Sequence, residues 1–230
     1  MNDTKIRPLL VAVKGYNVST AKKTGDPHVA RGRPREFDAE QALETALLMF
    51  WKHGYEGTSL ASLTKAMGIN VPSLYAAFGN KESLFRLAVE RYLSRPASYL
   101  PKALEAPTAR EVVARLFQGA IDMVMNPRHP DGCLLVQGAL VSGPLAEPIK
   151  DELKKKRHGA EILIRCRFEQ AQAAGDLPAD VNPEHLARYI TTVLWGMSVQ
   201  AAGGATREQL NQVADMVLRC WPAALSGKEA

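Results

Sequence analysis

Apolar side chains recur at helical spacing along most of the chain, beginning just after Phe37. Between Asp38 and Gly54 they follow the i, i+3, i+4, i+7 pattern of a helix that buries one face. The members of this stripe are Leu43, Ala46, Leu47 and Phe50. Asp38 is suited to begin the helix because its carboxylate accepts backbone N–H groups, and Gly54 is suited to end it.

Three shorter helical stripes follow this first helix. They predict helices over about 60–67, 71–78 and 81–95. Gly68 ends the first of them. Pro72 stands in the first turn of the second, where its missing N–H costs nothing.

Beyond these helices, Pro96, Pro101 and Pro107 mark a boundary between two parts of the chain. Further helices are predicted over about 108–125, 132–142, 146–174, 183–202 and 206–221. No run of alternating β-branched residues argues for a sheet. Residues 1–30 lack a sustained period and predict a flexible leader. The pattern therefore predicts an all-α fold with a small amino-terminal and a larger carboxyl-terminal helical part.

The segment 58–85 combines a short helix, a glycine-containing turn and a second short helix at the spacing of a helix-turn-helix. A recognition helix needs buried anchors on one face and slim or polar side chains on the face that enters a major groove. The predicted anchors are Ile69, Leu74 and Phe78. The predicted groove-facing residues are Val71, Pro72, Ser73, Ala76 and Ala77. Tyr75 and Lys81 are placed to reach phosphates.

The net charge of +5 resides entirely in the amino-terminal segment. Residues 1–36 contain eight lysines and arginines against three acidic residues, whereas the remainder contains 21 of each. Residues 31–36 form a basic arm, in which Arg-Gly-Arg-Pro-Arg resembles the core of an AT-hook. We expect Arg31 and Arg33 to enter an A/T-rich minor groove and Arg35 to contact a phosphate.

Three cysteines, Cys133, Cys166 and Cys220, are widely spaced and form no CxxC pair. This excludes a disulfide framework and a zinc knuckle and fits a reducing cytoplasm. No apolar run is long enough to span a bilayer, so no membrane association is predicted.

Cys133 is placed in the first turn of a helix, where the helix dipole lowers a thiol pKa and favours redox or electrophile chemistry. The alternative is a small buried residue. A metal site with His129 lacks a third ligand, so neither metal nor cofactor is predicted.

Residues 37 to about 90 resemble the TetR (tetracycline-repressor) family of bacterial transcription regulators. The resemblance rests on Gly68-Ile69, Ser73-Leu74-Tyr75, Phe78, Asn80-Lys81-Glu82 and Leu84-Phe85. It implies a DNA-binding domain over 37–82 and an effector-binding and dimerisation domain over 83–226. Such a regulator is cytoplasmic, associated with the nucleoid when it is bound to its operator.

The resemblance further implies a homodimeric repressor that binds a pseudo-palindromic operator with helix 71–78 in the major groove. A small-molecule effector in the carboxyl-terminal domain would release the DNA, and the last two helices would form the dimer. Carried over by position, Thr58, Ser59, Tyr75 and Lys81 contact phosphates, whereas Val71, Pro72 and Ser73 contact base edges. The Gly-Cys-Leu sequence at Cys133 resembles a subset of the family that includes sensors of oxidants or electrophiles.

An effector cavity combines apolar walls with a few polar groups. The predicted lining residues are Phe117, Ile121, Met123, Cys133, Gln137, Phe168, Trp195 and Met197. The run Lys154-Lys155-Lys156-Arg157 could attract an anion, but on a long amphipathic helix it is interpreted as a solvated face. Two rival functions stay open at this point. A cysteine-dependent enzyme would need Cys133 with His129 or His158, but no catalytic motif supports it. A helical adaptor would bind protein partners through the carboxyl-terminal bundle, and its helix-turn-helix would be vestigial.

Overall fold

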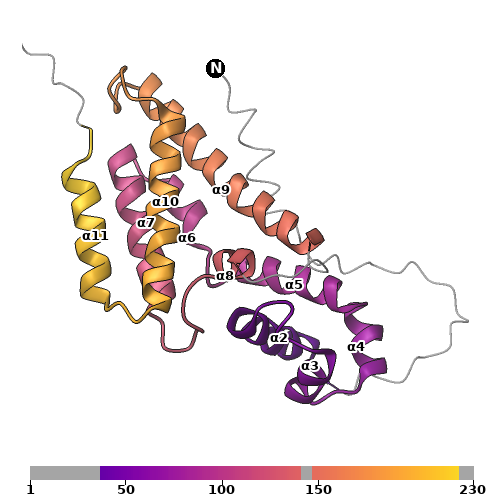
Figure 1. Ribbon diagram of the computed structural model, residues 1–230. Helices are drawn as coiled ribbons and strands as arrows, with labels where there is room; N and C mark the ends of the chain where they lie inside the picture. Colours follow the sequence, from indigo (N-terminus) through magenta and orange to yellow (C-terminus); the bar gives the residue numbers. More distant parts are fainter. Residues whose placement is uncertain (1–36, 141–146, 223–230) are drawn as a thin grey trace, which may run out of the picture.

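The computed structural model describes residues 37–140 and 147–222, and within these ranges all regular secondary structure is helical. The all-α prediction is confirmed. The leader and the basic arm with Arg31, Arg33 and Arg35 lie outside the described residues. Figure 1 shows a small group of helices at one end of the molecule and a larger bundle at the other.

The small group contains the predicted helix-turn-helix. Its helices are α2 (Ala39–His53), α3 (Leu60–Met67), α4 (Val71–Phe78) and α5 (Lys81–Ser94). Each begins at a side-chain cap that accepts a backbone N–H, which satisfies donors that a helix leaves free in its first turn. The caps are Asp38, Ser59, Asn70 and Asn80. Gly68 ends α3 with the left-handed φ of 66°.

Aromatic packing and one buried ion pair fasten α2 to α5. The Phe50 and Phe85 rings meet edge to face with centroids 5.0 Å apart, and both side chains are fully buried. Arg91 of α5 is also buried, and it pairs with Glu40 and Glu44 of α2. These contacts hold α2 and α5 as one unit from which α3 and α4 project.

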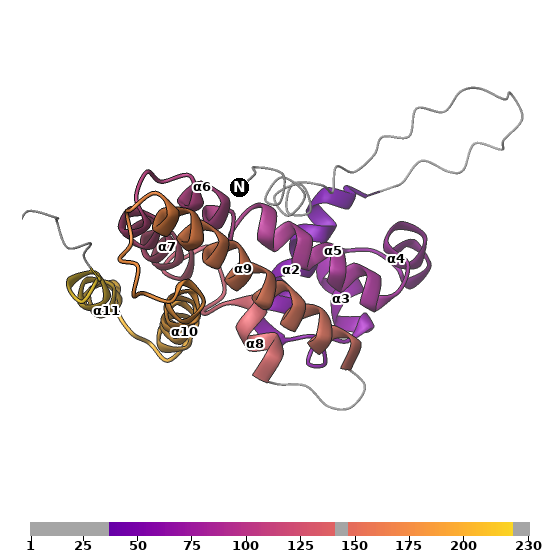
Figure 2. The same ribbon diagram turned by 90° about the horizontal axis from the view of Figure 1, so that it is seen from above.

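The larger bundle contains six helices within the described residues. They are α6 (Tyr99–Leu104), α7 (Ala109–Val124), α8 (Leu134–Leu140), α9 (Glu147–Ala173), α10 (Pro183–Ala202) and α11 (Arg207–Arg219). The long helix α9 packs on α8 and α10, and α7 packs on α6, α10 and α11. Figure 2 shows α9 running from the bundle towards the helix-turn-helix part.

Helix α6 is absent from the sequence prediction, which interpreted the region from Pro96 to Pro107 as a boundary without a helix. Pro101 is the third residue of α6. A proline is tolerated there because the first turn of a helix has no intrahelical partner for its N–H groups. The ring of Tyr99, at the start of α6, lies directly against the backbone of Gly119 in α7. This close contact fixes α6 on the bundle.

Candidate nucleic-acid interface and ligand cavity

Helix α4 presents one face to the protein and the other to solvent. Leu74 and Phe78 are buried, and Ile69 packs against the same core. On the opposite face, Val71 is 41% and Tyr75 is 47% exposed. This protruding helix with a slim outer face fits a major groove.

The other predicted groove-facing residues differ in exposure. Pro72 and Ala76 are exposed, whereas Ser73 and Ala77 are half-buried. The backbone N–H of Ser73 donates to the side chain of Asn70 over 2.8 Å. The helix therefore offers few side chains capable of bidentate base recognition.

The two residues that precede α3 have different environments. Ser59 is exposed and caps α3 by accepting the Ser62 N–H over 3.0 Å. Thr58 is fully buried, and its hydroxyl donates to the Gly54 carbonyl oxygen over 2.7 Å. The predicted phosphate contact of the Thr58 side chain does not fit this structure, because that hydroxyl is used inside the protein to hold the turn.

Lys81 begins α5 next to the recognition helix. Its ammonium lies 4.3 Å from the centre of the Tyr55 ring, a cation–π arrangement. Partial burial lowers the Lys81 pKa, although the nearby charge of Glu56 acts in the opposite direction. The Tyr55 ring thus holds a cation at the start of α5, three residues after the end of α4.

A direct contact links α2 to the larger bundle through the fully buried Trp51. The indole N–H of Trp51 donates to the Gly132 carbonyl oxygen over 3.2 Å. Its ring meets Tyr92 edge to face at 4.8 Å and lies 5.1 Å from the His129 ring. The helix that carries the helix-turn-helix is therefore attached to the segment that precedes Cys133.

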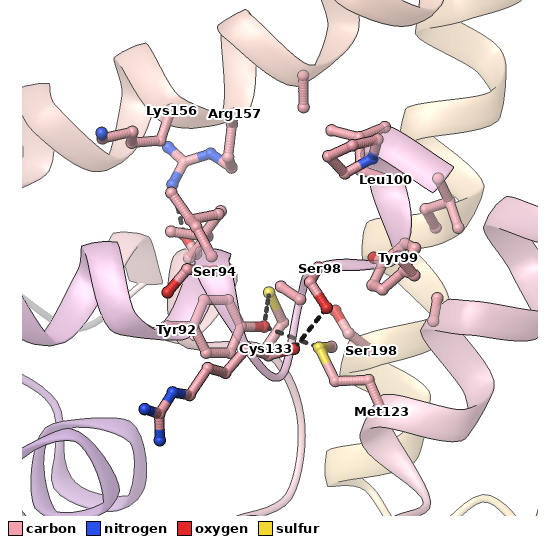
Figure 3. Close-up of a pocket in the computed structure, with 18 of the residues that line it drawn as sticks. Tyr92, Ser94, Ser98, Tyr99, Leu100, Met123, Cys133, Lys156, Arg157 and Ser198 are labelled. Atoms are coloured by element: carbon pink, nitrogen blue, oxygen red, sulfur yellow. Dashed lines mark hydrogen bonds between the residues drawn. The ribbon is translucent and has the colours of Figure 1, made fainter. Parts of the chain in front are cut away.

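A cavity of about 710 Å³ lies between α5 and the larger bundle. Most of its wall is apolar, and its polar groups come from several helices. Figure 3 shows Arg157 and Lys156 of α9 on one side and Tyr92, Cys133 and Met123 on the other. This volume and this composition are typical of small-molecule sites.

Cys133 belongs to the cavity wall, directly before α8. The Tyr92 hydroxyl oxygen lies 3.1 Å from its Sγ and 3.2 Å from the Sδ of Met123. Burial raises the pKa of the Cys133 thiol, although the Tyr92 hydroxyl, backbone N–H groups and the charge of Arg157 act to lower it. The prediction of a lowered pKa is therefore wrong, because desolvation outweighs the helix terminus.

The cysteines are expected to react with iodoacetamide in the order of their exposure. Cys220 is exposed, whereas Cys133 is half-buried and has a raised pKa. At neutral pH Cys133 is a neutral thiol, so its alkylation should lag behind that of Cys220 and accelerate as the pH rises. Peptide mass spectrometry over a time course measures both rates. Faster modification of Cys133 at neutral pH would contradict this assignment.

Three comparisons place the chain among known proteins. Residues 42–88 match the family model of bacterial regulatory proteins of the tetR family, and residues 109–217 match the tetracyclin repressor-like C-terminal domain. The repressor ComR of Escherichia coli is 36% identical over 195 residues, which are 84% of this chain and 93% of ComR. The chain belongs to the TetR family.

Other relatives agree with this assignment. The Escherichia coli repressor BdcR is 32% identical over 204 residues, covering 86% of this chain and 91% of BdcR. A solved structure of a cysteine mutant of the regulator CifR, complexed with 26-base-pair operator DNA, is 46% identical. It covers 83% of this chain and 100% of that chain with a TM-score of 0.79. This TetR-family protein is a helix-turn-helix transcription regulator, which sets aside the enzyme interpretation.

The cavity contains five of the eight predicted lining residues: Ile121, Met123, Cys133, Trp195 and Met197. The other three are outside its wall. Phe117 is core, and Phe168 packs against Trp221 with ring centroids 5.9 Å apart. The Gln137 amide donates to the Asp131 carbonyl oxygen. Helical periodicity identifies a buried face but not the cavity that it borders, which is why these three residues lie outside the wall.

Sequence reasoning missed Tyr92, Tyr99 and Arg157 of this TetR-family regulator as cavity residues. Tyr92 lies within the helix predicted over 81–95, and its side chain is fully buried. Arg157 was placed on a solvated face, but it is half-buried in the cavity wall. The sequence showed the basic run to which Arg157 belongs, but not the cavity that it borders.

Within the described residues, no helix has the length and apolar content required to cross a membrane.

No metal site emerges around His129 and Cys133. The Nδ1 atom of His129 lies 3.1 Å from the Met123 carbonyl oxygen, and its ring lies against Trp51. In the described part of the chain, no three His, Cys, Asp or Glu side chains are grouped as metal ligands would be. The observed role of His129 is packing beside Trp51.

Proposed function

We propose that this protein is a homodimeric, ligand-responsive repressor. Two copies of α4 would enter successive major grooves of a pseudo-palindromic operator, and an effector in the cavity would release the DNA. The observation that carries the proposal is the Trp51 contact. It joins α2 to Gly132 and Tyr92, and Tyr92 and the adjacent Cys133 border the cavity. A ligand that displaces these groups therefore changes the position of α2 directly.

The proposed DNA contacts divide by chemistry. Val71, Pro72 and Ser73 would contact base edges, including thymine methyl groups, whereas Ser59, Tyr75 and Lys81 would contact phosphates. The arm would add minor-groove contacts through Arg31 and Arg33 and a phosphate contact through Arg35. The operator complex of CifR supports DNA binding by a chain of this fold.

The proposed dimer forms through α10 and α11. Apolar side chains stand on the surface of these two helices, including Tyr189 at 50% and Met216 at 60% exposure. Val199 and Val213 continue this surface. Pairing the two helices with their copies would cover these side chains in a four-helix bundle.

Replacing Lys81 by alanine should weaken binding to every duplex and lower the slope of log K against log salt concentration by about 1. Replacing Val71 by alanine should instead reduce the preference for the operator, because an apolar base-edge contact is lost. Lys102→Ala is the matched control, since Lys102 is exposed on α6. Its affinity should not change.

Fluorescence anisotropy measures these affinities with a duplex from upstream of the protein's own gene and with a scrambled duplex. Preferential binding of the first duplex supports the proposal. Equal losses of Lys81→Ala and Val71→Ala on both duplexes would contradict the division of contacts. Absence of binding to any duplex at low salt would overturn the regulator function.

A second candidate for the signal is covalent modification of Cys133 by an electrophile. It is favoured by the position of the thiol in the cavity wall, 3.1 Å from the Tyr92 hydroxyl. The raised pKa opposes it. If Cys133→Ser abolishes release by a thiol-reactive compound but retains release by a non-covalent ligand, both signals operate at the same cavity.

A further inference from the structure

The charges around the cavity do not balance. Its wall contains the cations Arg91, Arg95, Lys155, Lys156 and Arg157 and the carboxylates Glu40 and Glu90. Arg91 and Arg95 face Glu40 and Glu44, and Lys156 pairs with Glu90. Among the described residues, these pairs leave two cations of the wall without an ion-pair partner, Arg157 and the exposed Lys155.

Arg157 differs from Lys155 because its guanidinium is partly removed from water. It is half-buried, and burial lowers the pKa of the group. Within the described residues, Arg157 has no carboxylate within ion-pair distance. Among the residues that the structure describes, it makes one hydrogen bond, donated from Nη1 to the Leu135 carbonyl oxygen over 2.5 Å. A guanidinium has five N–H donors, so most of this group's hydrogen-bonding capacity is free.

The neighbouring thiol does not neutralise Arg157. The charge of Arg157 acts on Cys133, but burial nevertheless raises the pKa of that thiol, which stays protonated at neutral pH. Burying a charge without a partner is unfavourable, and such charges in proteins normally pair or bind a ligand of opposite sign. Arg157 is therefore the partly buried cation of the wall that a ligand can neutralise.

The rest of the cavity is suited to an apolar body. Its wall includes Leu87, Leu100, Leu116, Leu163, Leu194 and Trp195. The hydroxyl groups of Ser94, Ser98 and Ser198 already donate to carbonyl oxygens of nearby residues. Figure 3 shows that the cations of α9 occupy one side of the open space rather than its centre. A cavity with positive charge at one side and apolar surface elsewhere is complementary to an amphipathic ligand.

We propose that the effector is an amphipathic anion whose acidic head group pairs with Arg157 while its hydrocarbon body fills the cavity. A carboxylate is the matching group, since a guanidinium binds it through two parallel hydrogen bonds. The inference deepens the proposed function and rests on the cavity being the effector site. It adds the chemical class of the ligand and the residue that selects it.

Isothermal titration calorimetry tests the inference with three probes of equal chain length: decanoate, decanol and decylamine. The full chain should bind decanoate about tenfold more tightly than decanol, because the head group gains a charge-assisted hydrogen bond. Decylamine should bind least. Arg157→Gln should lower decanoate affinity about tenfold and leave decanol unchanged.

Lys154→Gln is the matched control. Lys154 is exposed on the same helix and is not part of the cavity wall. Its removal takes away the same charge and should leave all three affinities unchanged. Equal loss of decanoate binding in both variants would mean that only the general positive field of α9 matters, which overturns the role of Arg157.

Operator release, measured by anisotropy with the same probes, separates this inference from the proposed function. Equal binding and equal operator release by decanoate and decanol would overturn charge selection and support the cavity as an effector site. Decanoate binding that requires Arg157 but leaves operator affinity unchanged would support the ligand class and overturn the proposed release mechanism. Absence of decanoate binding would overturn the inference, leaving operator binding to be judged by its own experiment.

Discussion

Replacing Trp51 by alanine is expected to lower the free energy of unfolding by about 3–5 kcal/mol, the usual cost of removing a buried aromatic side chain. Trp51 is 1% exposed, packs edge to face on Tyr92 and donates a hydrogen bond to Gly132. The alanine variant loses both contacts and leaves a cavity between the helix-turn-helix part and the larger bundle. Urea denaturation followed by circular dichroism measures the loss.

The variant Trp51→Phe separates stability from signalling. It retains an aromatic ring but loses the indole N–H, which leaves the buried carbonyl of Gly132 unpaired. The expected decrease in the free energy of unfolding is therefore smaller, about 1–3 kcal/mol. If Trp51 transmits the effector signal, this variant should bind ligand normally while releasing operator DNA less completely. Full ligand-dependent release at unchanged ligand affinity would show that the signal follows another route. Met49→Leu, a substitution of a half-buried residue on the same helix, is the control.

Replacing Gly119 by alanine should lower the free energy of unfolding by about 1–3 kcal/mol and weaken ligand binding as well. A Cβ at position 119 would lie 2.5 Å from Tyr99 Cβ and 2.6 Å from Tyr99 Cγ. These atoms are close to the backbone of α6 and cannot move aside independently of the helix. The substitution should therefore displace α6, whose Tyr99 borders the cavity.

Gly159→Ala is the matched control because it makes the same change within α9. A Cβ at Gly159 would meet nothing within 4 Å. Alanine has the better helix propensity, so this variant should be more stable by about 0.5–1 kcal/mol. Thermal and urea unfolding of both variants test these opposite changes in the free energy of unfolding. An unchanged stability of Gly119→Ala would show that α6 adjusts without loss.

The beginnings and ends of helices were accessible from the sequence where they depend on local chemistry. Asp38 and Gly68 cap their helices as predicted, because a side-chain acceptor or a left-handed glycine acts on the nearest turn. Helix α6 escaped prediction because the prolines around it indicate a break. Its position depends on the contact between Tyr99 and Gly119, twenty residues apart in the chain.

The all-helical class, the helix-turn-helix and most of the outer face of α4 could be predicted from the sequence, since each follows from periodicity and spacing over a few turns. The environments of Thr58, Cys133 and Arg157 depend instead on tertiary packing. Thr58 was expected on the surface and is buried. Cys133 was interpreted either as a thiol with a lowered pKa or as a small buried residue, and its pKa is raised. Arg157 borders a cavity. The physical reason is that burial and electrostatic environment depend on which distant helices pack around a residue, and no local pattern specifies those neighbours.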